Sequence, residues 1–168
     1  MSKPLIYIPS PRNIPEFEDA TDKLNADKLW VKFYPEEEAY NFARHFFLAH
    51  EEYTHLAILP DDLLVTEQHL THLKQGSEYF DVINGWCRNT IRLTPWWTGE
   101  QETEDQADTN ISLRSLPPDP PVSGQYEDYQ FESVESILDL KKVISVIPVL
   151  YAGFPFTFIS RKIVEQIP

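Results

Sequence analysis

Two adjacent carboxylates, Asp61 and Asp62, follow closely on the apolar run His55–Leu59. Pro60 separates the run from the carboxylates. The run predicts a buried strand, and in open α/β sheets the carboxyl ends of the strands face the ligand crevice. Carboxylates at that place suit a divalent cation, which takes oxygen ligands and completes its shell with water and substrate phosphates. The pair is equally typical of a solvated turn before a helix, and the pair alone does not separate the two interpretations.

Aromatic and basic residues gather further along the chain. Trp86, Trp96 and Trp97 could form an acceptor subsite, because aromatic faces stack on the apolar C–H patches of sugar rings. They could also anchor a long loop on the core. Arg88 and Arg92 in the same stretch could counter phosphate charge or pair with the acidic residues that follow.

His69 and His72 are spaced i, i+3 on a predicted helix and could ligate a metal. Because no third ligand follows in the sequence, a polar helix face is the more ordinary interpretation. Cys87 is the only cysteine, which excludes an intramolecular disulfide and a cysteine-rich zinc site. This cysteine usage fits a reducing compartment, and we expect a cytoplasmic protein.

Length and charge limit the function classes. The chain has 168 residues, which predicts about one domain, and a net charge of −13. So acidic a chain disfavours nucleic-acid binding through a basic patch and docking on anionic membranes. Phosphate binding through a cation remains open. The segment Met1–Ile14 lacks a basic start followed by a long apolar run, so we expect no signal peptide, and no stretch approaches 18 consecutive apolar residues, so we expect no membrane span.

The elements that must position these side chains alternate between strands and helices. This order predicts a mainly parallel sheet with helices packed on it and right-handed crossovers. The predicted strands are Leu5–Ile8, Leu29–Tyr34, His55–Leu59 and about Tyr79–Trp86. The predicted helices are Glu16–Leu24, Glu36 to about Glu52, and one capped by Thr66 that runs to Lys74 with Gly76 just past its end.

The amino-acid composition of the chain changes after these elements. Between Gly99 and Glu135 there are ten acidic residues, one basic residue and four prolines. We therefore predict a long acidic, proline-rich loop at about 99–132 inside a single domain spanning 1–168. A short helix at 133–142, strands at 143–149 and 156–159, and a helix at 161–167 capped by Ser160 complete the prediction.

Five segments, in this order, make the chain resemble the GT-A glycosyltransferases, especially family-2-like members. The order and spacing of the segments together carry the resemblance. The segments are the first strand Leu5–Ile8, Ala39–Arg44 for a helix written A-x-A-R-N, Tyr53–Leu63 for Y-x-L-F-L-D-D-D-V, Asp81–Trp86 for the next strand, and Gly153–Ile167 for G-x-x-L-I-R-R-E-V-F-E-x-I.

The resemblance implies a GT-A fold and a transfer of sugar from a nucleotide-sugar to a hydroxyl of a glycan, protein or lipid acceptor. It implies Mn²⁺ or Mg²⁺ held by Asp62, with Asp61 contacting the sugar or ribose, or sharing the metal. It also places Pro9, Ser10 and Arg44 among the residues that bind the nucleotide-sugar.

The chain departs from the family pattern at two places. The first Asp of the D-x-D motif is replaced by Pro60. Inverting members carry an acidic general base after the helix that corresponds to Arg161–Ile167, and this sequence ends at Pro168. We therefore expect a minimal or C-terminally truncated transferase core. Glu127 and Asp128 are the candidate bases, and solvated loop charges are the alternative for them.

These departures keep two further functions open. A non-catalytic relative could have kept the fold as a nucleotide-sugar-binding or protein-interaction module. A metal-dependent phosphatase or hydrolase using Asp61 and Asp62 would need additional Asp or His ligands, which the sequence does not place.

Overall fold

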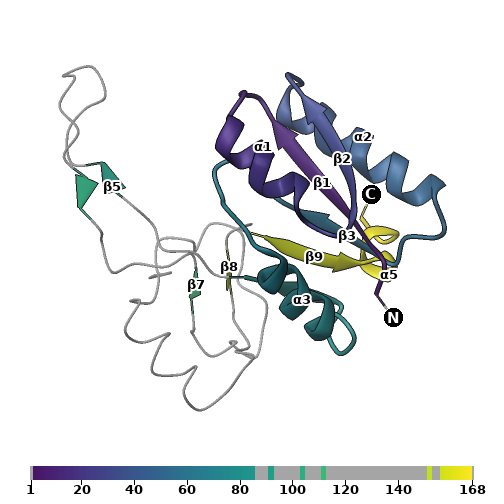
Figure 1. Ribbon diagram of the computed structural model, residues 1–168. Coiled ribbons are helices and arrows are strands. Elements are labelled where there is room, and N and C mark those ends of the chain that lie inside the picture. The colour runs from purple at the N-terminus through teal and green to yellow at the C-terminus, as the bar shows by residue number, and fades with distance from the viewer. Residues whose placement is uncertain are drawn as a thin grey trace, which may run out of the picture. The chain divides into compact units, whose positions relative to one another are not determined.

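The computed structural model describes residues 2–85, 91–92, 103–104, 111–112, 151–152 and 156–167. The chain divides into two compact units, one formed by Met1–Gly85 with Phe154–Pro168 and one by Trp86–Gly153. The first unit holds a five-stranded sheet and the helices that flank it (Figure 1).

The sheet has the strand order β2-β1-β3-β9-β4. Three parallel strands, β1 (Pro4–Ser10), β2 (Asp27–Lys32) and β3 (His55–Ile58), are followed by β9 (Thr157–Ser160), which pairs antiparallel with β3 and with β4 (Val82–Asn84). The predicted α/β sheet flanked by helices is thus confirmed, as a mixed sheet with two parallel and two antiparallel pairings. The strand predicted at 156–159 is present as β9, but its antiparallel direction was not predicted, because the residues of so short a strand carry no mark of strand direction.

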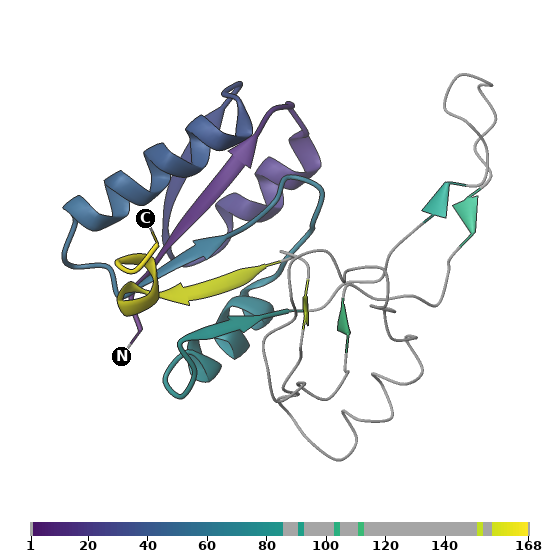
Figure 2. The same ribbon diagram turned by 180° about the vertical axis from the view of Figure 1, so that it is seen from behind.

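Helices cover both faces of the sheet. Side chains alternate along β1, so Ile6 and Ile8 face one layer while Leu5 and Tyr7 face the other. The first face carries α1 (Pro15–Asp22) and α3 (Glu67–Gly76), in front in Figure 1. The second face carries α2 (Glu36–Ala49) and α5 (Arg161–Val164), in front in Figure 2.

One of the crossovers differs from the prediction. The chain passes from β1 to β2 over α1 and from β3 to β4 over α3, on the same face but in opposite directions across the sheet. Two such connections between parallel strands have opposite handedness, so the prediction of right-handed crossovers is wrong for one of them. Leu70 and Leu73 hold α3 on this face by joining the same core as Phe17 of α1.

The helices begin where the sequence predicts and end differently. Pro15 opens α1, and Glu36, Glu37 and Glu38 fill the first turn of α2. We predicted α2 to run to about Glu52, but it ends at Ala49, where carbonyl groups of the last turn bind a side chain from α5.

The strand β2 ends two residues earlier than predicted. Phe33 has φ of 62°, a left-handed conformation that interrupts an extended strand. Phe33 and Tyr34 consequently leave the sheet and are exposed to 64% and 59%.

Gly76 has a different role from the predicted one. It is the last residue of α3 rather than the residue that terminates the helix from outside. A Cβ at this position would lie 2.1 Å from Cδ1 of Ile83 in β4. The glycine therefore lets α3 approach β4 closely.

The second unit contains two described strand pairs. β5 (Ile91–Arg92) pairs antiparallel with β6 (Thr103–Glu104), and β7 (Ile111–Ser112) pairs antiparallel with β8 (Tyr151–Ala152). The strands β6 and β7 fall within the segment predicted as a loop at about 99–132. The rest of that segment, together with the helix predicted at 133–142 and the strand predicted at 143–149, lies outside the described residues.

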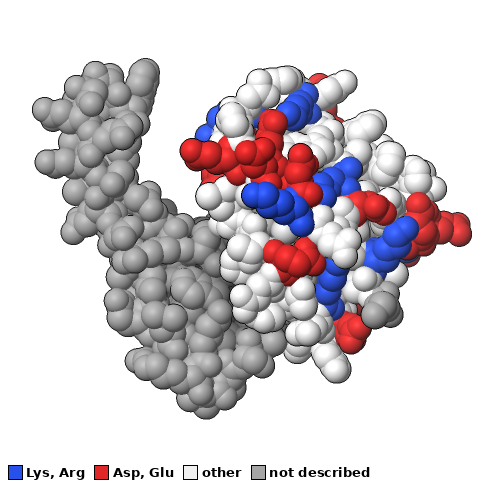
Figure 3. Space-filling view, viewed as in Figure 1, with Lys and Arg blue, Asp and Glu red and all other residues white. Residues whose placement is uncertain are grey.

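Charges of both signs are interspersed on the face of the first unit that carries α1 and α3 (Figure 3). This face shows no large basic patch of the kind that binds nucleic acid. Within the described residues, no helix is long and apolar enough to cross a membrane.

Candidate functional site

Polar side chains meet where the parallel strands end. Leu59 still bonds to β1, since its N–H donates to Tyr7 O at 2.9 Å, and Pro60 then leaves the sheet. Leu63 N donates to Pro60 O at 3.4 Å, so Asp61 and Asp62 are the two central residues of a turn. Asp61 is 6% exposed, whereas Asp62 is exposed.

Asp61 is bound by an arginine from the neighbouring strand end. Arg12 Nε donates to Asp61 Oδ2 at 3.3 Å, and Arg12 Nη2 donates to Asp61 Oδ1 at 2.5 Å. This two-point geometry is the strong form of an arginine–carboxylate pair. The Arg12 side chain remains 56% exposed, so the pair joins a buried carboxylate to a guanidinium that faces solvent. The hydrogen bond to Asp61 raises the pKa of Arg12, which keeps the guanidinium charged.

Ser10 fixes the loop that carries Arg12. The Ser10 side chain is 1% exposed, and its hydroxyl donates to Arg12 O at 2.7 Å. Ser10 O in turn accepts from Phe33 N at 3.2 Å, which ties the end of β2 to the same loop. Ser10 therefore lies at the carboxyl end of β1, and its hydroxyl donates within the protein. Pro9 lies in β1 opposite Val31 and has no N–H to offer a ligand.

Backbone strain accompanies this end of the sheet. Phe33 is the non-glycine residue with positive φ among the described residues, at 62°. A left-handed conformation costs roughly 1–2 kcal/mol for a residue with a Cβ, and such strain tends to persist at functional sites. The hydrogen bond from Phe33 N to Ser10 O helps to hold it here.

The donor set at this end does not fit the divalent cation that the resemblance implies. Both oxygens of Asp61 accept hydrogen bonds from Arg12, and Pro60 has no ligating side chain. Asp62 alone would remain as a free carboxylate. Within the described residues there is no group of three His, Cys, Asp or Glu side chains that could hold a metal ion. Metal binding by Asp61 and Asp62 therefore stays a prediction without a described donor set.

Arg44, predicted to join the nucleotide-sugar site, lies elsewhere. Its Nε donates to Val164 O at 3.4 Å, and its Nη2 donates to Ile167 O. Both carbonyls belong to the segment that follows β9, at the amino ends of the parallel strands. The structure thus brings Ser10, Asp61 and Asp62 together at one end and places Arg44 toward the other.

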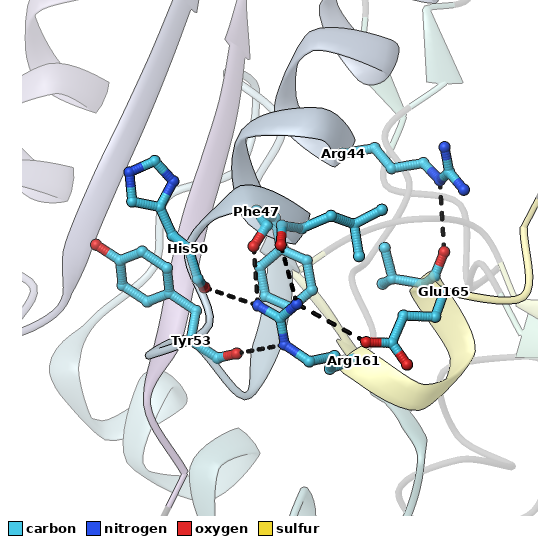
Figure 4. Close-up of polar contacts among 8 residues, drawn as sticks. Arg44, Phe47, His50, Tyr53, Arg161 and Glu165 are labelled. Carbon is cyan, nitrogen blue, oxygen red and sulfur yellow. Dashed lines mark hydrogen bonds and ion pairs between the residues drawn. The ribbon is translucent and has the colours of Figure 1, made fainter.

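The amino end of the sheet is organised around Arg161 (Figure 4). Its Nη2 donates to Phe47 O and His50 O at 2.8 and 2.7 Å, and its Nε donates to Tyr53 O at 3.0 Å. Nη1 lies 3.4 Å from Leu48 O and 3.9 Å from Glu165 Oε1. The guanidinium also stacks over the Phe47 ring, 4.4 Å from its centroid. Arg161 therefore donates to carbonyl groups in and just beyond the C-terminal turn of α2, where Phe47 O and His50 O also accept from backbone N–H groups.

A second polar group at the amino end joins β9 and α5 to Asp81, the residue before β4. Ser160 Oγ donates to Asp81 Oδ1 at 2.9 Å, and Lys162 Nζ donates to Asp81 Oδ2 at 2.9 Å. The bonds from Lys162 and Ser160 lower the pKa of Asp81. Ser160 was predicted to cap the last helix with its side chain, but its hydroxyl binds Asp81 instead.

Two histidines take structural roles. His69 Nδ1 accepts a hydrogen bond from Thr66 N at 3.0 Å, so it completes the capping of α3. His55 in β3 is 9% exposed, and its Nδ1 lies within hydrogen-bond distance of Ser2 Oγ and Thr54 Oγ1. Burial lowers the pKa of His55.

Several predicted site residues lie outside the part of the chain that the structure describes. They are the candidate bases Glu127 and Asp128 and the candidate acceptor residues Trp86, Trp96 and Trp97. Arg12 is the residue that sequence reasoning missed. A basic residue two positions after the first strand was a usable signal, because the next loop at the same sheet end is acidic.

Comparisons with known proteins give little further information. No protein-family model matches the chain, and no curated protein matches it. Among solved structures, the chain is similar to the protein A197 from STIV, with 17% sequence identity and a TM-score of 0.47. The alignment covers 99% of this chain and 69% of that chain. This likeness assigns no function to the chain.

Proposed function

We propose that the carboxyl end of the sheet binds a nucleotide-sugar and that the protein transfers its sugar to an acceptor hydroxyl. The observation that carries this proposal is the ion pair between Arg12 and Asp61, which joins the ends of β1 and β3 into one polar site with the exposed Asp62 beside it. Ligands of open α/β sheets bind at this end of the strands.

The placement of the GT-A-like segments supports the proposal. The described parts of four of them correspond to β1, β3, β4 and β9 with α5, which are neighbours in one sheet, and Ala39–Arg44 lies on α2, which packs on that sheet. The segment Tyr53–Leu63 then delivers Asp61 and Asp62 to the strand ends. A GT-A fold of the mixed, mainly parallel kind is part of the proposal.

The chemistry divides between a donor side and an acceptor side. The acceptor oxygen attacks the anomeric carbon while the bond from that carbon to the diphosphate oxygen breaks, and the acceptor proton passes to a general base. Glu127 and Asp128 remain the candidate bases. The exposed carboxylate of Asp62 can accept hydrogen bonds from hydroxyl groups of the nucleotide-sugar. Charge develops on the departing diphosphate, so the donor side must present a cation or hydrogen-bond donors to it.

Calorimetric titration of the whole chain with UDP, GDP and their sugars tests this function. We expect saturable binding of at least one nucleoside diphosphate and slow release of that diphosphate from its sugar when acceptors are supplied. Titrations with EDTA and with Mn²⁺ should be run side by side. If no nucleotide binds to the folded protein in either condition, the proposed function is wrong.

A non-catalytic nucleotide-sugar-binding module is the second candidate. It is favoured by Pro60 at the position of the first motif carboxylate and by the engagement of Asp61 with Arg12. The two candidates differ in turnover, not in binding. Nucleotide-sugar binding with no release of nucleoside diphosphate over many hours would select the second candidate.

A further inference from the structure

We propose that Arg12 takes the place of a divalent cation at this site, so that the protein binds the diphosphate of its donor without a metal. This inference rests on the proposed function and concerns the same end of the sheet. The sequence predicts Asp61 and Asp62 as metal ligands. In this inference the Arg12 side chain, which binds Asp61, contacts the diphosphate instead of a metal ion.

The first argument is that Asp61 is already occupied. Its side chain is 6% exposed, and each of its oxygens accepts a hydrogen bond from Arg12. A metal ion would have to displace the guanidinium and would leave Arg12 without its carboxylate. Mg²⁺ keeps near-octahedral coordination, and of the turn residues only Asp62 would offer a free carboxylate.

The second argument is that Arg12 keeps hydrogen-bond donors for a ligand. A guanidinium has five N–H groups in a planar fork, and it matches the geometry of a phosphate. The described hydrogen bonds to Asp61 involve Nε and Nη2, and within the described residues the guanidinium has no other hydrogen-bond partner. The side chain is 56% exposed, so its remaining donors face solvent.

The third argument is that the guanidinium is held in place before a ligand arrives. Asp61 fixes its orientation from the turn after β3, and Ser10 fixes the loop backbone through its hydrogen bond to Arg12 O at 2.7 Å. A donor that is already oriented loses less freedom when it binds an anion. Asp61 is therefore a positioning residue, and Arg12 is the residue that contacts phosphate.

The test uses variants that avoid an unpaired buried carboxylate. Asp61→Asn removes the buried charge and keeps Arg12, whereas the double variant Arg12→Ala with Asp61→Asn removes the cation in the same background. Lys162→Ala is the matched control, because it also removes one exposed cation and one ion pair, at the opposite end of the sheet. Circular dichroism checks that each variant is folded.

Calorimetry with UDP and GDP measures the dissociation constant of the full chain in EDTA and in Mn²⁺. For the nucleotide that binds, we expect the two constants to agree within about threefold, since Arg12 already supplies the positive charge. In EDTA, the double variant should bind about ten- to a hundredfold more weakly than Asp61→Asn, because a hydrogen bond to a charged group is lost. Lys162→Ala should bind like the unmodified chain.

Two results would overturn the inference. The first is binding that appears only with Mn²⁺ and is abolished by Asp61→Asn, which would make Asp61 a metal ligand. The second is equal affinity of Asp61→Asn and the double variant in EDTA, which would show that Arg12 does not contact the ligand. Both results leave nucleotide binding itself intact, so they are distinct from a failure of the proposed function, in which no nucleotide binds under either condition.

Discussion

The two ends of the sheet each carry an arginine, and the two guanidinium groups differ in what they contact. Arg161 at the amino end is 21% exposed and binds backbone carbonyl groups of Phe47, Leu48, His50 and Tyr53. Arg12 at the carboxyl end is 56% exposed and binds a single carboxylate, that of Asp61. One arginine is fully used by the fold, and the other retains donors that face solvent.

This difference separates a structural arginine from one that can bind a ligand. Arg161 connects α2 and α5 by donating to main-chain carbonyl groups. Its donors are used within the fold, so they do not select a ligand. Arg12 is oriented by a buried side chain and presents its remaining donors outward. The end of the sheet with the open guanidinium also contains the strained Phe33 and the exposed Asp62.

Removing Arg161 should have the largest effect on stability. Arg161→Ala removes hydrogen bonds to four carbonyl groups in and beyond the last turn of α2, and we expect a loss of about 2–4 kcal/mol in the free energy of unfolding. Arg161→Lys should recover only a small part of the lost stability. A single ammonium group cannot replace a planar guanidinium, whose separate N–H groups donate to several carbonyls at once. Urea denaturation measures both variants. A loss below that of the neighbouring surface variant Lys162→Ala would contradict the structural role.

Removing Arg12 should lower the stability by an intermediate amount, and a second substitution at Asp61 should restore most of it. Arg12→Ala leaves the buried Asp61 carboxylate unpaired, which should cost about 1–3 kcal/mol of unfolding free energy. Adding Asp61→Asn should restore most of that loss, since no buried charge then lacks a partner. Urea denaturation of the two single variants and the double variant measures the coupling. If the double variant is no more stable than Arg12→Ala, the ion pair does not couple the two residues as described.

The smallest expected effect is a loss of stability at acidic pH, which should come from His55 at the amino end of the sheet. Burial lowers the pKa of His55 below its ordinary 6.5, so the unfolded chain binds more protons than the folded one in that range. The stability linked to His55 is complete above pH 6.5 and is lost as the pH falls through the folded pKa, by at most about 1.4 kcal/mol per pH unit.

The measurement is urea denaturation between pH 5 and 7, at about room temperature, of His55→Asn and of the exposed control His45→Asn. His55→Asn should flatten the dependence of stability on pH, and His45→Asn should leave it unchanged. This range lies above the ordinary pKa of Asp81, 3.8, so that group does not titrate in it. An unchanged slope in His55→Asn would contradict a buried, neutral His55.

The sequence predicts the elements of the first unit well, because their signals are local. Proline and glutamate at the start of α2, the apolar run of β3, and Thr66 before α3 each act within one or two turns. The insertion of β9 between β3 and β4 is not local. It depends on which strand edges are free after the first three strands have paired, and no residue pattern records that.

The candidate site could be predicted only in part for the same reason. Asp61 and Asp62 lie at the strand ends, as expected from an apolar run that stops abruptly. The partner of Asp61 was missed, since Arg12 stands 49 positions earlier and reaches Asp61 only after β1 and β3 have paired. Arg44 was misplaced because a motif match gives a helix position without showing which strand end it faces.

The position of β9 also sets an order of events during protein synthesis. The described partner of β4 in the sheet is β9, which leaves the ribosome more than seventy residues later. At a synthesis rate of about 5–20 residues per second, β4 waits several seconds without its hydrogen-bonding neighbour. The approach of α3 to Ile83 across Gly76 is a contact that β4 can make in that interval. Among the described strands, the one made last is therefore the one that joins the edge strand to the growing sheet.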